Sequence, residues 1–158
     1  MRIVCISDTH GRHARLEVPP CDLPIHAGDA TRRGRLEELR SALAWMSRRF
    51  RRMAYNRERG PEIAAHWAAI PEGLDLLLTH GPPRGVGDRA ILGVNAGCDD
   101  LLARVHLVRP RVHVFGHIHE AAGEYRLPGL PTRSYNVASS RLLGWTRAPV
   151  VLELPPSC

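Results

Sequence analysis

The 158-residue sequence contains no lysine, and its net charge of +6 comes from 22 arginines set against 16 acidic residues. Ten of the arginines lie between positions 32 and 59. A basic tract can attract nucleic acid, but apolar residues recur at helical spacing over residues 36–46, with most of the arginines between them. We therefore interpret the tract as the solvated face of a helix and keep nucleic-acid binding only as a lesser alternative.

Long apolar runs and paired cysteines are also missing. No window approaches the roughly 18 apolar residues of a membrane helix, and the chain opens on an expected strand without signal-peptide architecture. The four cysteines lack C-x-x-C spacing, which excludes a zinc knuckle and gives no sign of a disulfide framework. We expect a single domain over residues 1–158 in the reducing cytoplasm, with no membrane partner.

Two histidines follow the most strand-like segment of the chain. Val112–Phe115 is an apolar, β-branched run, and Gly116 ends it just before His117 and His119. Residues i and i+2 of an extended segment point to the same side, and ligands bind at the carboxyl ends of strands in α/β sheets. Because neutral imidazole is a common ligand of divalent metals, we interpret the pair as metal ligands rather than as ordinary turn residues.

Three other expected strands end in the same way. The segments are residues 1–6, 23–27 and 74–78, and each is followed by acidic or histidine residues beside a glycine. Together the four strand ends present Asp8, His10, Asp29, His80, His117 and His119. Six oxygen and nitrogen ligands without a thiolate suit two hard-to-borderline divalent ions. Asp29 stands alone at its strand end and is predicted to bridge the ions, whereas His13 and His26 are interpreted as packing or supporting residues.

The remaining segments complete an α/β pattern. Helices are expected over residues 35–49, 61–70 and 98–108, and further strands near 134–138 and 150–154. Residues 50–60 read as a short edge strand or a loop. The glycine-rich loop 84–97 is expected to shape the site.

At these residues the sequence resembles the calcineurin-like metallophosphoesterases. The family signature D-x-H, G-D, histidine and G-H-x-H is matched in order by Asp8-Thr9-His10, Gly28-Asp29, His80 and Gly116-His117-Ile118-His119. The runs Thr-His-Gly-Pro-Pro, His-Val-Phe-Gly-His-Ile-His-Glu and Asn-Val-Ala-Ser are similar to a small-domain subgroup. The resemblance implies an αββα sandwich with a two-metal site. It also implies the ligand sets Asp8, His10, Asp29 and His119 for one metal, and Asp29, His80 and His117 for the other.

One family motif, G-N-H followed by an acidic residue, is missing. Residues 54–58 could be a degenerate version, with Asn56 as the ligand and Arg57 in place of the histidine. Alternatively, the strand, its turn and the following hairpin are deleted, which we favour because the chain is short for the family. In both cases the second metal is expected to lack a ligand, and the usual catalytic histidine is absent.

The resemblance therefore implies a metal-dependent phosphoesterase with weakened activity on phosphodiesters or other small phosphate-ester or nucleotide-like substrates. The expected cofactors are two divalent ions, Mn²⁺ foremost with Fe or Zn²⁺ as alternatives, the second one weakly held. Asp29 is assigned a catalytic role, and His13 is the nearest histidine that could replace the missing acid. The alternative is a catalytically crippled member that binds metal and phosphate as a sensor or partner module.

Overall fold

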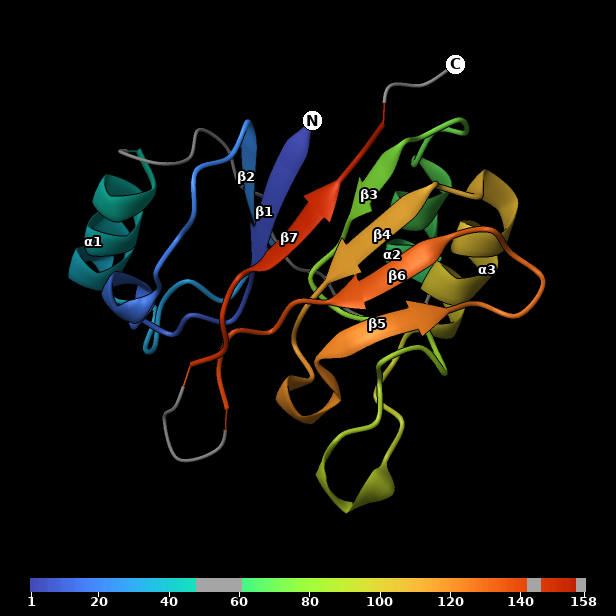
Figure 1. Ribbon diagram of the computed structural model, residues 1–158. Helices are drawn as coiled ribbons and strands as arrows, with labels where there is room; N and C mark the ends of the chain where they lie inside the picture. Colours follow the sequence, from blue (N-terminus) through green and yellow to red (C-terminus); the bar gives the residue numbers. More distant parts are fainter. Residues whose placement is uncertain (48–60, 142–145, 156–158) are drawn as a thin grey trace.

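Two β-sheets lie face to face between helices in the computed structural model, which describes residues 1–47, 61–141 and 146–155 (Figure 1). The first sheet has the strand order β2-β1-β7, with β1 at Arg2–Ile6, β2 at Leu23–His26 and β7 at Val150–Glu153. Strand β1 runs parallel to β2 and antiparallel to β7. The carboxyl ends of β1 and β2 therefore lie at the same edge of this sheet.

The second sheet has four strands in the order β3-β4-β6-β5. They are β3 at Leu76–Leu78, β4 at Val112–Phe115, β6 at Arg133–Asn136 and β5 at Gly123–Arg126. The first three run parallel, and β5 pairs antiparallel with β6 at the edge. Strands β3 and β4 thus also end side by side.

Helices cover the outer face of each sheet. They are α1 at Leu36–Ser47, α2 at Pro61–Ala68 and α3 at Asp99–Val108. Figure 1 shows α1 beside the first sheet and α2 and α3 beside the second. In the described part of the chain, short 3₁₀ turns occupy His13–Arg15, Ile91–Gly93 and His119–Ala121. Among the helices of the described residues, none has the length and hydropathy needed to cross a membrane.

The alternation of side chains along the strands builds three apolar clusters. Ile3 and Cys5 of β1 face Val112 and Val114 of β4 in the cluster between the sheets. A second cluster places Ile6 under Ala42 of α1, and a third places Phe115 under Leu101 and Val105 of α3. Apolar side chains on both faces of β1 and β4 thus hold four layers together, and the predicted αββα sandwich is confirmed.

The two sheets join where the predicted ligands begin. Ser7 and Ala138 form an isolated parallel bridge between the end of β1 and the segment after β6. The backbone N–H of Ser139 donates to the Ser7 carbonyl over 2.8 Å. These bonds hold the carboxyl ends of strands from both sheets at one place.

The element boundaries differ from the sequence-based expectation in a few places. Strand β5 was not predicted, because its largely exposed Gly-Glu-Tyr-Arg run lies at the sheet edge and turns only one apolar side chain, Tyr125, toward the core. Strand β3 begins at Leu76 rather than residue 74, and β6 spans 133–136 rather than 134–138. The predicted ends of the first and second helices differ by one or two residues where described, as helix ends commonly do. The segment 50–60, which was predicted to be a short strand or a loop, falls entirely outside the described residues.

The buried imidazole of His113, on β4, should make the stability of the fold decrease at acidic pH. It is fully buried, its Nε2 lies 2.9 Å from Thr79 Oγ1, and burial lowers the pKa of His113 to about 3. In the unfolded chain the pKa is about 6.5. Between these values the unfolded chain binds a proton that the folded chain does not, so the free energy of unfolding falls as the pH falls.

Between pH 6.5 and pH 5 the free energy of unfolding should fall by about 2 kcal/mol less in His113→Gln than in wild type. Urea unfolding at both pH values measures this difference. His106→Gln, at an exposed position on α3, is the matched control and should keep the wild-type pH dependence. An unchanged pH dependence in His113→Gln would contradict a buried neutral imidazole at this position.

Candidate metal centre

The predicted ligands occupy turns with an unusual backbone. Asp8, His10, Asp29 and His117 have φ angles of 53°, 43°, 53° and 72°, in the left-handed region that non-glycine residues rarely adopt. Backbone hydrogen bonds hold these turns: Asp8 N donates to Gly28 O over 2.9 Å, and His10 N donates to Asp29 O over 3.0 Å. The loops after β1 and β2 are therefore fixed against each other.

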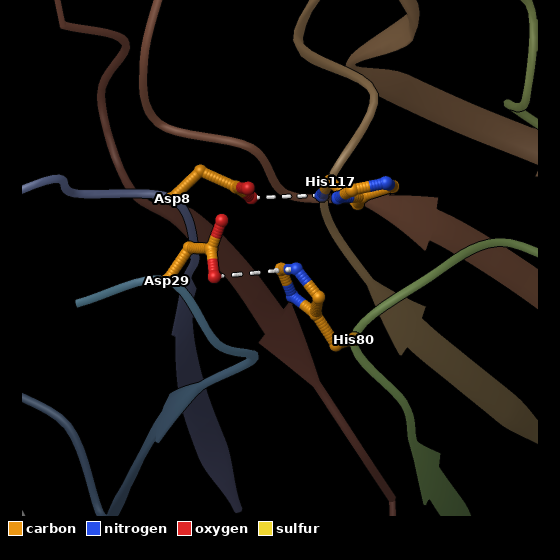
Figure 2. Close-up of side chains that lie close together, drawn as sticks. All are labelled: Asp8, Asp29, His80 and His117. Carbon is orange, nitrogen blue, oxygen red and sulfur yellow. Dashed lines mark hydrogen bonds and ion pairs between the residues drawn. The ribbon is translucent and has the colours of Figure 1, made fainter. Parts of the chain in front are cut away.

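The loops after β3 and β4 are fixed in the same manner. Gly116 N donates to the carbonyl of His80 over 2.8 Å. The backbone N–H of His117 donates to Oδ2 of Asp8 over 2.9 Å and so links the second sheet to the first (Figure 2). All four ligand-bearing loops thus converge on one region.

Among the described residues, the convergence produces two groups of side chains that could each hold a metal ion. One contains Asp8, Asp29, His80 and His117, and the other contains Asp8, His10 and His119. Within each group the potential ligand atoms lie within 4.8 Å of one another. Figure 2 shows the first group, with the Asp8 carboxylate directed toward the backbone N–H of His117 and the Asp29 carboxylate toward the ring of His80. The structure therefore brings together all six residues that the sequence nominated.

Short distances join the ligand atoms. Nε2 of His80 lies 3.5 Å from Oδ1 of Asp29, and Nε2 of His119 lies 3.4 Å from Oδ1 of Asp8. The Nε2 atoms of His10 and His119 are 3.3 Å apart. Two imidazole nitrogens facing each other at this distance suit a shared cation better than a bond between two neutral rings.

Asp8, and not Asp29, belongs to both groups. The sequence-based expectation gave the shared position to Asp29. Asp8 is fully buried behind the site, whereas the side chain of Asp29 is 42% exposed. The bridging role of Asp29 remains a prediction, and the geometry offers Asp8 as a second candidate.

Backbone carbonyls orient two of the imidazoles. Nδ1 of His80 lies 2.8 Å from the carbonyl of Ala27, and Nδ1 of His10 lies 3.3 Å from the carbonyl of Thr31. A carbonyl only accepts hydrogen bonds, so each Nδ1 carries the proton and each Nε2 keeps a free lone pair. In both residues that Nε2 faces the other ligands.

The carboxylate of Asp8 fits a cation. Within the described part of the chain, its Oδ1 is buried without a hydrogen-bond partner. Burial alone would raise the pKa of Asp8, but contacts with His119, Ser7 and the His117 N–H outweigh burial and hold the pKa below its ordinary value. The contact between Nε2 of His119 and the Asp8 carboxylate in turn raises the pKa of His119. A charged, buried oxygen with room for a further partner is what a metal ligand requires.

Two glycines allow the close approach of the ligand loops. A Cβ at Gly28, whose φ is 114°, would lie 2.3 Å from Nδ1 of His80. A Cβ at Gly116 would lie 2.2 Å from Ser7 Oγ and 2.3 Å from Asp8 Oδ2. Both positions therefore require glycine for packing, and Gly28 requires it also for its positive φ.

Asn136 and Ser140 support the site and were given no role from the sequence. Nδ2 of Asn136 donates to the carbonyls of Ile118 and Gly87 over 2.8 and 3.1 Å. The hydroxyl of Ser140 donates to the backbone carbonyl of Asp8 over 2.5 Å. The Asn-Val-Ala-Ser run at residues 136–139 was the available signal for Asn136, because a buried amide at the end of a strand needs several hydrogen-bond partners.

His13 and His26 lie outside both ligand groups. The ring of His13 packs on Trp45 at 5.2 Å between centroids, and its Nε2 is 3.5 Å from Ser41 Oγ of α1. Nε2 of His26 lies 3.1 Å from Thr9 Oγ1, and burial lowers the pKa of His26 to about 4. The structure thus gives both residues the supporting positions expected of them and does not bring His13 to the ligands. Asn56 lies outside the described residues.

The contact between Gly28 and His80 generates a prediction about metal affinity. Gly28→Ala should displace the His80 ring and break its bond to Ala27, which we expect to weaken the Asp29-containing site roughly 10–100-fold. Titration of Mn²⁺ into metal-free protein by calorimetry measures this loss. Gly73→Ala is the control, because Gly73 has φ 73° but nothing within 4 Å of an added Cβ. An equal loss in both variants would trace the effect to backbone strain alone.

Comparison with known proteins agrees with this geometry. Residues 1–132 match the model of the calcineurin-like phosphoesterase superfamily domain. The human metallophosphoesterase domain-containing protein 1 is 27% identical over 234 residues, which cover 98% of this chain and 71% of the relative. UPF0046 protein T07D4.2 of Caenorhabditis elegans is 51% identical over 71 residues, covering 44% of this chain and 18% of the relative.

A second worm relative, UPF0046 protein K07C11.7, is 26% identical over 189 residues that cover 78% of this chain and 65% of its own length. The match to the human protein extends over 234 residues against 158 in this chain, so that relative has internal segments without counterpart here. From the match over residues 1–132, the chain belongs to the calcineurin-like phosphoesterase superfamily.

Proposed function

We propose that this protein hydrolyses small phosphate esters, phosphodiesters or nucleotide-like molecules among them, with two divalent metal ions. Membership of the family implies metal-dependent hydrolysis of phosphoesters in general. The observation that carries the proposal is the pair of Asp/His groups that share Asp8 at the ends of four strands. Hydrolysis of bis(4-nitrophenyl) phosphate with and without Mn²⁺ is the direct test.

The ligand set fits such ions. Asp8, His10 and His119 would hold one ion, and Asp8 or Asp29 with His80 and His117 would hold the other. When bound, the pair would supply an activated water and neutralise charge on the phosphoryl oxygens. Oxygen and nitrogen donors without a thiolate suit Mn²⁺, which we would supply first, with Fe or Zn²⁺ as alternatives.

The site has a buried side and a solvent-exposed side. Asp8 is buried and receives the His117 N–H, so it forms the fixed back of the site. Asp29 and His117 are exposed and His80 is half-buried, so the substrate would approach along their side. The carbonyls of Ala27 and Thr31 keep the histidine lone pairs directed inward without further rearrangement.

A second candidate function is metal and phosphate binding without efficient turnover. The absent G-N-H motif favours it, together with the internal segments that the human relative has and this chain lacks. Such a protein would act as a sensor or partner module. It would bind Mn²⁺ and inorganic phosphate by calorimetry, yet give no metal-dependent release of nitrophenolate.

The shared position of Asp8 predicts how the ions depend on each carboxylate. After extensive dialysis we expect wild-type protein to keep one ion per chain, because the second site lacks a family ligand. Asp29→Asn should also keep one ion, at Asp8, His10 and His119, but lose metal-dependent activity. Asp8→Asn should keep none, because it removes a ligand from both groups. Elemental analysis gives the ion count, and a Mn²⁺ titration of activity gives the function.

The outcomes separate the two bridging assignments. Loss of the one retained ion in Asp29→Asn would make Asp29 a ligand of both sites and restore it as the bridge, as the sequence suggested. Wild-type turnover in Asp29→Asn would contradict the two-metal proposal altogether. Asp22→Asn, at an exposed position ahead of β2, is a matched control and should leave ion content and activity unchanged.

The missing catalytic histidine predicts a strong dependence on the leaving group. A nitrophenolate departs without a proton, whereas an alkoxide such as a ribose oxygen requires one. We expect measurable hydrolysis of bis(4-nitrophenyl) phosphate but very weak hydrolysis of cyclic nucleotides and alkyl phosphodiesters. Rates across a series of aryl esters should fall steeply as the pKa of the leaving group rises.

A flat dependence on leaving-group pKa would show that another residue protonates the leaving oxygen. His13→Ala then tests the one histidine that the sequence nominated. A steeper dependence in His13→Ala would assign the role to His13, although its ring packs against Trp45. An unchanged dependence would exclude it.

A further inference from the structure

A cavity of about 330 Å³ adjoins the metal centre at His119. Its lining comprises His119, Glu120, Arg141 and Arg147. His119 belongs to one ligand group, whereas the two arginines and Glu120 have no part in the function proposed above. The cavity therefore lies where a second portion of a bound substrate would reach.

Arg147 is held rigidly against the segment that supports Asp8. Its Nη1 donates to the carbonyls of Ser140 and Ala138 over 2.7 and 3.3 Å, and its backbone N–H donates to the Ser139 carbonyl over 2.6 Å. Ser140 in turn donates its hydroxyl to the Asp8 carbonyl. The guanidinium group thus has a fixed position relative to the metal centre, through one connected series of hydrogen bonds.

The charges around the cavity favour an anion. Arg147 is half-buried and Arg141 is exposed, and within the described part of the chain neither forms an ion pair with a carboxylate. Burial, followed by the positive charge of Arg141, lowers the pKa of Arg147. Glu120 opposes the two arginines with a single negative charge. Two guanidinium groups that repel each other at one cavity are stabilised when an oxyanion lies between them.

We propose that this cavity binds a phosphate group of the substrate other than the one that is cleaved. The proposal rests on the phosphoesterase function and narrows its substrates to phosphate esters that carry a second phosphate. Arginine is suited to this task because its planar N–H groups match phosphate oxygens in pairs. The negative charge of Glu120 lowers the affinity of the cavity for phosphate, so the second phosphate is recognised and the product is still released after hydrolysis.

Binding of inorganic phosphate to metal-free protein tests the cavity apart from catalysis. We expect Arg141→Gln to weaken binding about tenfold by calorimetry, the loss of one charge-assisted contact. Glu120→Gln should strengthen binding, because it removes the opposing charge. Arg126→Gln, at an exposed position on β5, changes the net charge equally and should bind like wild type. Arg141→Gln is preferred to Arg147→Gln because Arg147 also holds the Ala138–Ser140 backbone.

A pair of substrates tests the role of the cavity in catalysis. The 4-nitrophenyl ester of thymidine 5′-phosphate is compared with the same ester carrying a phosphate on O3′, so the cleaved bond is identical. With Mn²⁺ we expect a KM about tenfold lower for the 3′-phosphorylated ester. Arg141→Gln should lose this preference and keep the wild-type kcat/KM for the ester without the second phosphate.

The results distinguish failure of this proposal from failure of the phosphoesterase function. Equal kcat/KM for the two esters in wild type would overturn the second-phosphate site and leave the phosphoesterase function intact. Phosphate binding that is the same in Arg141→Gln and wild type would also overturn it. No hydrolysis of either ester, with phosphate binding still dependent on Arg141 and Glu120, would overturn the phosphoesterase function and support a phosphate-binding cavity.

Discussion

The buried carboxylate of Asp8 is the constraint on which the rest of the site depends. Its side chain is fully buried where β1 ends, and taking a charge out of water costs several kcal/mol unless positive partners compensate. The His117 N–H and His119 Nε2 supply part of that compensation from the second sheet, and Oδ1 still has no hydrogen-bond partner among the described residues. The same carboxylate therefore contacts the second sheet and would bind the metal ion through its remaining free oxygen.

The absence of a Cβ at Gly116 and Gly28 makes this arrangement possible. At Gly116 the backbone of the second sheet approaches Ser7 and Asp8 more closely than any side chain would allow, and at Gly28 the His80 ring lies where a Cβ would stand. The apolar cluster between the sheets also sets the site geometry. Its members on β1 and β4 fix the separation of these two strands; they are Ile3, Cys5, Val112 and Val114. Core packing and site geometry are thus set by the same strands.

The meeting of six ligands was predicted from local pattern and strand topology, whereas the αββα layers were implied by the resemblance to the metallophosphoesterases. Apolar residues on both faces of β1 and β4 require a covered sheet on each side, and parallel strands end at one edge. The sequence did not predict that Asp8 would belong to both groups. The shared position of Asp8 depends on its left-handed turn and on the distance between the two sheets. The spacing of the motifs along the sequence reveals neither. The edge strand β5 turns only Tyr125 toward the core, so it has no alternating apolar pattern to predict it. The 3₁₀ turn at His13–Arg15 directs His13 toward α1, a placement that the spacing of residues does not reveal.

The left-handed turns also suit the Asp and His residues found at four of the six ligand positions. A non-glycine residue at positive φ costs about 1–2 kcal/mol, and Asn, Asp and His tolerate that region better than branched side chains do. Asp8, His10, Asp29 and His117 all adopt it, which brings each side chain into the site immediately after its strand. The backbone bonds from Asp8 to Gly28 and from His10 to Asp29 offset part of the cost. Strain of this kind persists only where other interactions over-determine the turn, and the shared carboxylate, the bridge at Ser7 and the hydroxyl of Ser140 provide them. The ligands are therefore preorganised by the fold, and binding of an ion would require little rearrangement of the backbone.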